Sequence, residues 1–235
     1  MKKRSIQSTS PAAILAGGLL FAGPAAGAVL LSENFDGASN VFGMPTYTYA
    51  ANYTLPNGLT PGGGTQYAHG GAGVPNSVST NTFTVSGVSL TLGTGFTTSQ
   101  IDAGGASLGL YAQFSTYLLQ SDFGQVSVTF KDAANSPIGS PVLIGSQALV
   151  NGLAAGNNGS FGDARAWAAD TLATLVPAGA RTVDISVLET KQASGTVIDG
   201  YIDNVQVSIN AVPEPGTMAL SGLTGLALLR RRRRS

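Results

Sequence analysis

The chain has no cysteine, a single histidine and only 10% charged residues among its 235. Without cysteine there is no disulfide scaffold, no thiolate metal site and no cysteine nucleophile. Because His69 is the only histidine, a metal site built from several imidazoles is excluded as well. The fold must therefore be stabilised by a hydrophobic core, and a chain of this length is long enough to bury one.

Basic residues are almost missing from the middle of the sequence. Residues 29–210 contain four basic residues against eleven acidic ones, a net charge of −7, although the formal charge of the whole chain is zero. The remaining basic residues lie at the two ends, in 2–4 and 230–234. A protein that binds DNA or RNA needs positive charge on its folded part, so nucleic acid is excluded as a partner.

The first 28 residues have the layout of a secretory signal peptide. A basic start is followed by an apolar stretch at residues 12–22 and by the small residues of 26–28. We predict cleavage by signal peptidase between Ala28 and Val29. The alternative is an uncleaved membrane anchor, but Pro24 interrupts the helix where a span would have to continue.

The C-terminus carries a second ordered pattern, in which Pro213-Glu214-Pro215 precedes an apolar run at residues 218–229. The two prolines end any preceding strand and hold the chain extended. As a helix, residues 216–229 would be about 21 Å long, which is a marginal span for a hydrocarbon core of about 30 Å. The arginines that follow would keep the end of the chain in the cytoplasm. These are Arg230, Arg231, Arg232, Arg233 and Arg234. The alternative is an ordinary C-terminal helix with a solvated basic tip.

This order of Pro-Glu-Pro, apolar helix and arginine tail, over residues 212–235, resembles the PEP-CTERM sorting signal of Gram-negative bacteria. The resemblance implies recognition by an exosortase, a membrane-embedded cysteine protease-transferase, and cleavage near the Pro-Glu-Pro. It also implies delivery to the outer cell surface or the extracellular matrix, where such proteins are typically associated with exopolysaccharide and biofilm. We therefore divide the chain into a signal peptide (1–28), a domain (29–210) and a sorting signal (211–235).

Residues 29–210 alternate apolar and polar side chains in short runs separated by Gly, Asn, Ser and Pro, which indicates antiparallel strands with one solvated face. In residues 82–92 the apolar parity changes at Gly87, which predicts a β-bulge. Residues 164–175 have a helical composition, or form an irregular strand around Trp167. We predict an all-β, antiparallel two-sheet sandwich of the jelly-roll type, flanked by a signal-peptide helix and a C-terminal hydrophobic helix.

The segments 175–187 and 199–207 resemble the closing strands of galactose-binding-like jelly-roll domains, which are common in bacterial carbohydrate-binding modules. The resemblance implies glycan binding through loops or a concave sheet face. It also implies, in many members, a structural Ca²⁺ held by acids of the first and last strands.

The residues themselves give a reason to consider calcium. Asp203 shares the parity of Tyr201 and Val205, so its carboxylate is expected on the apolar face, where it needs a partner. Glu33 and Asp36 offer hard oxygen ligands of the kind that Ca²⁺ takes. The hypothesis is that Glu33 or Asp36 meets Asp203 around Ca²⁺, the only cofactor that the sequence suggests. In the alternative, Asp203 is hydrated or accepts backbone N–H bonds.

Aromatic side chains are the better candidates for ligand binding. Tyr47, Tyr49 and Tyr53 share one parity and would form a strip on a strand, and Trp167 and Tyr67 are further candidates elsewhere. The apolar C–H faces of sugars pack on such rings. The alternative is that these residues are ordinary half-buried strand residues.

Patterns that suggest catalysis are weak. The G-x-S-x-G pattern at residues 105–109 matches a nucleophile elbow, but His69 precedes Ser107 and a strand pattern follows it, against the order of that template. His69 is interpreted as a solvated loop residue. A carboxylate pair of a glycoside hydrolase has the candidates Asp163, Asp170, Asp199 and Asp203. Eleven acids make some pair inevitable, so no catalytic residue is predicted.

The sequence thus predicts an exported, exosortase-processed protein whose sandwich is non-catalytic and binds extracellular polysaccharide. Two alternatives stay open: a structural matrix or adhesion protein without a glycan site, and a glycoside hydrolase. An exposed aromatic strip would favour binding and buried tyrosines would favour structure. A cleft with convergent carboxylates and a shifted pKa would favour the hydrolase.

Overall fold

The computed structural model of the protein describes residues 27–48, 66–118, 120–153, 166–192 and 195–212. This part of the chain forms ten strands and two short helices. In chain order they are β1 (Ala28–Glu33), β2 (Thr46–Thr48), β3 (Gln66–Ala72), β4 (Ser79–Ser89), α1 (Thr98–Asp102), β5 (Ala106–Thr116), β6 (Phe123–Lys131), β7 (Val142–Ile144), α2 (Gln147–Asn151), β8 (Ala168–Leu175), β9 (Thr182–Lys191) and β10 (Val197–Ala211).

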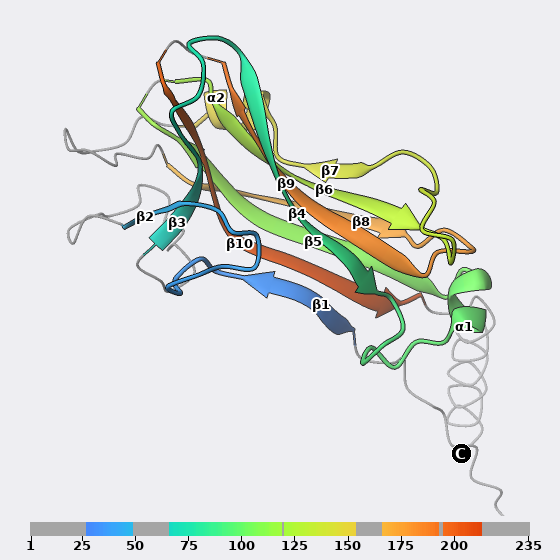
Figure 1. Ribbon diagram of the computed structural model, residues 1–235. Helices are drawn as coiled ribbons and strands as arrows, with labels where there is room; N and C mark the ends of the chain where they lie inside the picture. Colours follow the sequence, from blue (N-terminus) through green and yellow to red (C-terminus); the bar gives the residue numbers. More distant parts are fainter. Residues whose placement is uncertain (1–26, 49–65, 119, 154–165, 193–194, 213–235) are drawn as a thin grey trace, which may run out of the picture.

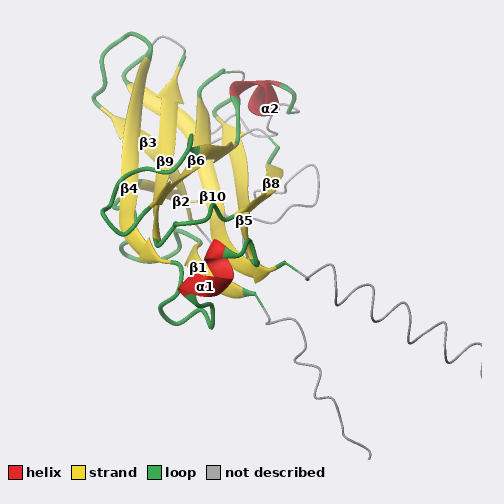
Figure 2. Cartoon of the chain, turned by 90° about the vertical axis from the view of Figure 1, so that its right-hand side faces the viewer, coloured by secondary structure: helices red, strands yellow, loops and turns green. Residues whose placement is uncertain are grey.

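The strands form two antiparallel sheets that pack face to face (Figures 1 and 2). The six-stranded sheet has the order β2-β3-β10-β5-β8, and β1 pairs with the second half of β10. The four-stranded sheet has the order β4-β9-β6-β7. Strand β10 therefore joins the first and last parts of the domain in one sheet. The predicted all-β sandwich of the jelly-roll type is confirmed.

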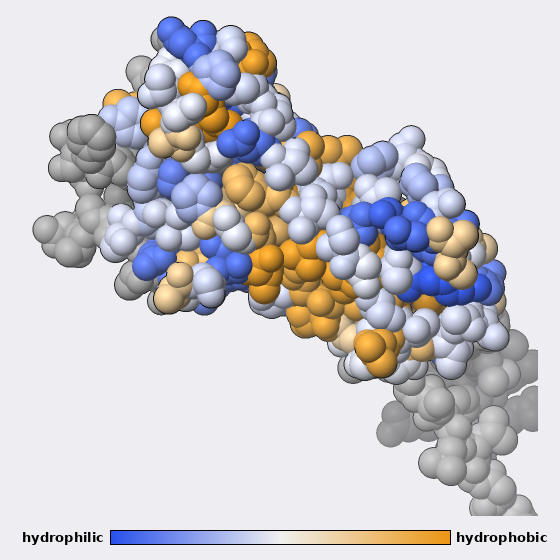
Figure 3. Space-filling model, in the orientation of Figure 1, coloured by the Kyte–Doolittle hydropathy of each residue, from blue (hydrophilic) through white to orange (hydrophobic). Residues whose placement is uncertain are grey.

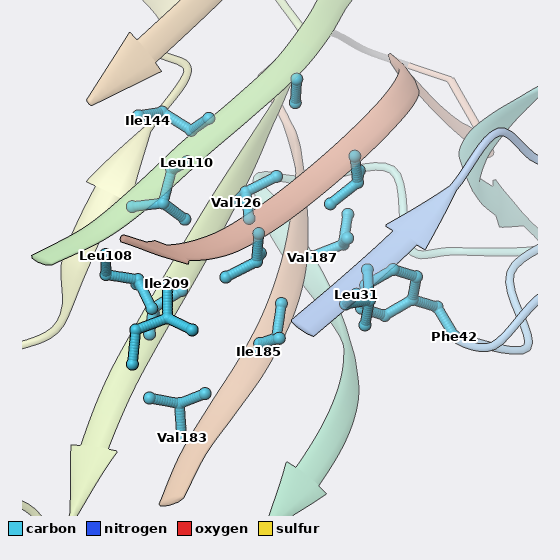
Figure 4. Close-up of a cluster of buried hydrophobic side chains, with 14 of the residues drawn as sticks. Leu31, Phe42, Leu108, Leu110, Val126, Ile144, Val183, Ile185, Val187 and Ile209 are labelled. Carbon is cyan, nitrogen blue, oxygen red and sulfur yellow. The ribbon is translucent and has the colours of Figure 1, made fainter. Parts of the chain in front are cut away.

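The hydrophobic core lies between the two sheets (Figure 4). It forms because each strand alternates, so that every second side chain points inward. Val183, Ile185 and Val187 of β9 are fully buried in this way. Burying a side chain of this size contributes about 1.5–3 kcal/mol. The inward-pointing side chains from the opposite sheet include Leu31, Leu108, Leu110 and Ile209.

The bulge predicted at Gly87 is present in β4. The register between β4 and β9 shifts between Val85 and Val88, and Gly87 has a φ of +70°. Glycine adopts this left-handed conformation at little steric cost. The change of parity in the sequence is therefore a reliable sign of the bulge here.

A second bulge, in β10, makes one predicted parity wrong. Asn204 has a φ of 52°, and the register between β10 and β5 shifts between Asp203 and Gln206. Because one residue is inserted, the side chains before and after it change faces. Val205 belongs to the core between the sheets, whereas Tyr201 belongs to a separate aromatic cluster. Asp203, two residues after Tyr201, thus lies on the side of Tyr201 and not on that of Val205.

The segment around Trp167 is a strand, because residues 168–175 form β8. The two helices are single turns at opposite ends of the sandwich (Figure 1). Helix α1 begins at a capping box, in which the Thr97 hydroxyl accepts the Gln100 N–H and the Gln100 side chain accepts the Thr97 N–H.

The predicted signal-peptide helix and the predicted C-terminal helix lie outside the described residues. Within the described ranges, no helix is both long and apolar enough to cross a membrane. Strand β1 begins at Ala28, and β10 ends at Ala211. The first and last strands thus begin and end within one residue of the predicted domain limits.

Candidate functional site

Aromatic side chains gather on the outer face of the six-stranded sheet, away from the core. We call Tyr47, Tyr67, His69, Trp167 and Tyr201 the aromatic cluster. Cross-strand pairing brings them together: Tyr47 lies opposite Tyr67, and His69 lies opposite Tyr201. The cluster is therefore assembled from β2, β3, β10 and the residue before β8, which are far apart in the sequence.

The rings of the cluster are in direct contact. Tyr47 stacks on His69, with centroids 3.8 Å apart and planes at 3°. The ring centroid of Tyr67 lies 4.8 Å from that of Tyr201. Tyr67 also makes an edge contact with Trp167, with ring centroids 5.6 Å apart. Such pairs add about 0.5–1.5 kcal/mol each beyond the burial of their area. The cluster is thus a second, smaller core on the outer face of the sheet.

The accessibility of the cluster is uneven. Tyr67 and Trp167 are fully buried and Tyr201 is 1% exposed, whereas Tyr47 is half-buried. Of the four predicted ligand-binding residues, Tyr47 and Trp167 therefore lie in one cluster, with Tyr47 at its accessible side. The other two, Tyr49 and Tyr53, lie outside the described residues. Tyr201 was missed, and only strand pairing brings it and the candidate Tyr67 beside Tyr47.

His69 is neither solvated nor in a loop, so that interpretation is wrong. It is in β3 and only 5% exposed, and its Nδ1 accepts the Gly71 N–H at 3.2 Å. Burial lowers the pKa of His69 from 6.5 to about 4. The imidazole is thus neutral at pH 7, as the acceptance of the Gly71 N–H by its Nδ1 requires.

This low pKa predicts a loss of stability in acid. The unfolded chain binds a proton at His69 below pH 6.5, whereas the folded chain does so only near pH 4, so the contribution of His69 is lost as the pH falls through this window. We expect the free energy of unfolding, relative to that of a His69→Asn variant, to fall by roughly 2 kcal/mol between pH 7 and pH 4. Urea denaturation of both proteins at each pH measures this difference, and a constant difference would contradict the prediction.

A polar strip continues along the same outer face. In β5 the even-numbered residues from 106 to 114 point into the core, so the odd-numbered residues face outward. Gln113 donates to the Tyr111 hydroxyl at 2.9 Å and accepts from Asn204 at 3.1 Å. Tyr111 and Asn204 are half-buried, and Gln206 nearby is exposed. This strip was not predicted from the sequence, although its signal is visible in the alternation of β5.

Three acidic residues lie close together near the ends of β9 and β10. The carboxylate of Asp122 accepts the Gln192 N–H at 2.7 Å and the Asp199 N–H at 3.0 Å. Burial and the charge of Asp122 raise the pKa of Asp199 from 3.8 to about 6. The same two causes raise the pKa of Glu189 well above its ordinary value. Asp122 and Glu189 are both fully buried.

The residues predicted to bind calcium lie near one another on the sheet. Glu33 lies opposite Val205, two residues along β10 from Asp203. The oxygens of Glu33 accept the N–H groups of Phe35 and Val41, each at 2.8 Å. Asp36 accepts the Gln66 N–H at 3.0 Å, and Asp203 accepts the Asn204 N–H at 2.7 Å. In the described ranges, no group of three His, Asp or Glu side chains is placed to hold a metal ion. The calcium site stays a prediction.

The candidates for catalysis are not brought together. Ser107 lies within β5, opposite Asn210, and not at a turn between a strand and a helix. His69 lies opposite Tyr201, nine residues away along β10. Asp170 accepts the Gly145 N–H at 2.8 Å. Asp163 lies outside the described residues.

The surface of the face shown in Figure 3 has an apolar band across its middle, over β4 and β1 (Figure 3). Phe83, Val85 and Val88 of β4 are core side chains that stay half-buried there. Both strands are edge strands, so the two sheets leave this side of the core partly open.

The end of the chain matches a known sorting signal. Residues 211–234 match the PEP-CTERM protein-sorting motif. The chain is thus an exported β-sandwich protein. More particularly, it carries the signal for exosortase-dependent sorting to the cell surface, and the predicted resemblance is confirmed. The predicted sorting residues Pro213, Glu214, Pro215 and the five arginines fall within this match and outside the described residues. No curated protein matches the sequence.

Several solved structures are similar in fold. A family 16 carbohydrate-binding module has 15% identity and a TM-score of 0.35, covering 68% of this chain and 89% of the module. A xylan-binding domain from Paenibacillus barcinonensis has 11% identity and a TM-score of 0.36, covering 80% of this chain and 97% of the domain. The enzymatically active domain of a tailspike protein from bacteriophage CBA120 has 13% identity and a TM-score of 0.38, over 72% of this chain. This chain spans only 18% of that tailspike chain. These likenesses concern the fold alone.

Proposed function

We propose that the sandwich is a non-catalytic module that binds extracellular polysaccharide at or near the cell surface of a Gram-negative bacterium, in connection with exopolysaccharide and biofilm. The sorting motif supports display at the surface. The outer face of the six-stranded sheet supports the binding, because it carries the aromatic cluster and the polar strip side by side on β10 and β5.

The single observation that carries the proposal is the position of Tyr47. Its ring is half-buried, stacked on His69 and supported from below by Tyr67 and Tyr201. A ring held in this way loses little rotational freedom when a sugar packs against it. Asn204 and Gln206, on the adjacent strip, are a half-buried and an exposed amide side chain, and amides suit the hydroxyl groups of a sugar.

A structural matrix or adhesion protein is the second candidate, and one observation favours it. Tyr67, Trp167 and Tyr201 are buried, which is what a purely structural cluster requires. In that case Tyr47 only covers the cluster and contacts no glycan. The two candidates therefore differ in whether the accessible part of Tyr47 contacts a glycan.

We expect Tyr47→Ala to weaken polysaccharide binding at least tenfold, the loss that removing one stacked ring of about 1.5 kcal/mol produces. The measurement is a glycan-array screen of the processed protein, followed by calorimetric titration with the best glycan. The control is Leu143→Ala, which removes an exposed side chain from the other sheet and leaves the aromatic cluster intact. If the array gives no glycan signal, the matrix role replaces the binding role. If both variants bind the glycan as the wild type does, Tyr47 is not part of the glycan site.

The hydrolase alternative has less support in this arrangement. A glycoside hydrolase places two carboxyl groups about 5–9.5 Å apart on either side of the sugar bond. In the acidic group of Asp122, Glu189 and Asp199, only Asp199 is not fully buried. The group therefore does not present two carboxyl groups to a substrate.

The calcium hypothesis has a simple test. If Ca²⁺ joins Glu33 or Asp36 to Asp203, then EDTA lowers the melting temperature of the processed protein, and added Ca²⁺ restores it. The same melting temperature with and without EDTA would favour the alternative, in which these carboxylates only accept backbone N–H bonds. The array screen in EDTA then shows whether glycan binding needs the metal.

A further inference from the structure

The carboxyl group of Glu189 lies in a niche built from three glycines. A Cβ at Gly70 would lie 2.7 Å from Glu189 Cβ, one at Gly124 would lie 2.8 Å from Oε1, and one at Gly200 would lie 2.2 Å from Oε2. These glycines belong to β3, β6 and β10. Glycine inside a strand weakens it, since it offers no side chain to pack. Three strands thus give up a side chain to make room for one acid.

The described residues of the niche surround the carboxyl group of Glu189 but do not form hydrogen bonds with it. Among the described residues, neither carboxyl oxygen of Glu189 has a hydrogen-bond partner, and Glu189 is fully buried. A buried polar group without a partner is costly, and an ionised one is far more so. The niche is therefore suited to the neutral, protonated acid and poorly suited to the carboxylate.

The surrounding charges act in the same direction. Asp122 precedes β6 and Asp199 lies in β10, and both are acids. Lys191 is on the same face of β9, but its ammonium group donates to the carbonyls of Pro75 and Ser77 at 2.5 and 3.3 Å. Strand β3 contributes His69 on its outer face, and β4 contains no titratable side chain. No cation among the described residues is thus paired with Glu189, whose neighbours include acids.

We propose that Glu189 is a proton-controlled latch: it keeps this end of the sandwich closed while it is protonated, and opens it when it ionises. An ionised Glu189 is stabilised only if water enters the niche, which requires β10 and β3 to move away from β9. Gly200, in the niche wall, is bonded to Tyr201, and the Tyr201 hydroxyl donates to Asp199 at 3.4 Å. The opening therefore disturbs the aromatic cluster as well.

The raised pKa of Glu189 determines how the stability of the fold changes with pH. The unfolded chain releases the proton of Glu189 near pH 4.5, whereas the folded chain keeps it to a higher pH. Stability is thus lost as the pH rises from about 4.5 through the pKa of the folded state, by up to tenfold in the unfolding constant per pH unit. Asp199 acts in the same direction up to about pH 6, and His69 acts in the opposite direction up to pH 6.5. Comparison with a variant removes these two contributions.

The test compares the processed wild-type protein with Glu189→Gln. Trp167 is the only tryptophan of the chain and lies in the aromatic cluster, so its fluorescence reports both unfolding and local opening. We expect the ratio of the wild-type unfolding constant to that of the variant to rise at least tenfold between pH 5 and pH 9, in urea denaturation followed at Trp167. The control is Asp102→Asn, which removes an exposed acid at the opposite end of the sandwich. The ratio of the wild-type unfolding constant to that of Asp102→Asn should stay the same from pH 5 to pH 9. A ratio for Glu189→Gln that is the same at every pH overturns the latch.

A second measurement on the wild type alone covers the case in which Glu189→Gln does not fold. Hydrogen exchange, corrected for its intrinsic pH dependence, is compared between the N–H groups of Gln192 and Asp199 and those of the core residue Ile185. The latch requires protection at Gln192 and Asp199 to fall preferentially as the pH rises. Equal changes at the three sites overturn it.

The effect of the latch on glycan affinity rests on the proposed function, but the latch itself does not. If both hold, the affinity of the wild type for the array-selected glycan falls from pH 5 to pH 9 by more than that of Glu189→Gln. If Trp167 and hydrogen exchange show the opening while no glycan binds at any pH, the latch stands and the proposed function fails. If a glycan binds and no opening is seen, the latch fails alone.

Discussion

Gly200→Ala is expected to remove most of the stability of the fold. The added Cβ would lie 2.2 Å from Oε2 of Glu189 and 2.7 Å from the carbonyl carbon of Phe123. The first contact is with the end of a side chain, but the second is with the backbone of the facing sheet, which cannot turn away. Overpacking that forces the backbone to shift costs about 3 kcal/mol or more. Urea denaturation followed by circular dichroism gives the change in the free energy of unfolding.

Gly152→Ala is the matched control for this substitution. A Cβ there meets its nearest atom at 3.5 Å, an ordinary contact, and its φ of −78° suits any residue. Its effect should therefore stay within about 0.5 kcal/mol. A Gly200→Ala protein as stable as the Gly152→Ala protein would show that the two sheets do not approach so closely at this end.

Trp167→Ala is expected to have the next largest effect. Trp167 is fully buried against Tyr67, outside the main core, so its removal leaves a cavity in the aromatic cluster. Truncation of a buried tryptophan costs about 3–5 kcal/mol. We expect the melting temperature to fall by about 10 °C or more, as measured by circular dichroism, since the fluorescence probe is lost with the side chain.

Trp167→Phe provides the comparison, because it keeps an aromatic ring in the same place. We expect it to retain more than half of the stability that Trp167→Ala loses. A Trp167→Ala protein that melts as the wild type does would contradict the description of the cluster as a second core. Because Trp167 acts on stability first, the half-buried Tyr47 is the cleaner position at which to test glycan binding.

The fold class could be predicted from the sequence, because the fold class depends on local patterns. Alternation predicted the strands, and the change of parity at Gly87 located a bulge, since glycine marks a position where the left-handed conformation is easily reached. The sorting signal could also be predicted from the sequence, because its proline, apolar and arginine parts follow one another directly in residues 213–234.

The arrangement of the site could be predicted only in part. Tyr47 and Trp167 were identified as aromatic candidates, but their neighbours come from other strands that only the sheet order brings near. The bulge at Asn204 was not predicted, although asparagine adopts the left-handed conformation more readily than most residues, and the parity assigned to Asp203 was therefore wrong. Glu189 was not singled out in the sequence, since nothing in its own segment reveals glycines on three other strands.

Because of the inserted residue at Asn204, the odd-numbered side chains of β10 lie on the outer face before the bulge and in the main core after it. Its second half supplies Val205, Val207 and Ile209 to the main core, whereas Tyr201, in its first half, belongs to the outer cluster. Substitutions in the first half of this strand can therefore alter the outer face of the sheet while the half that packs in the main core stays as it is.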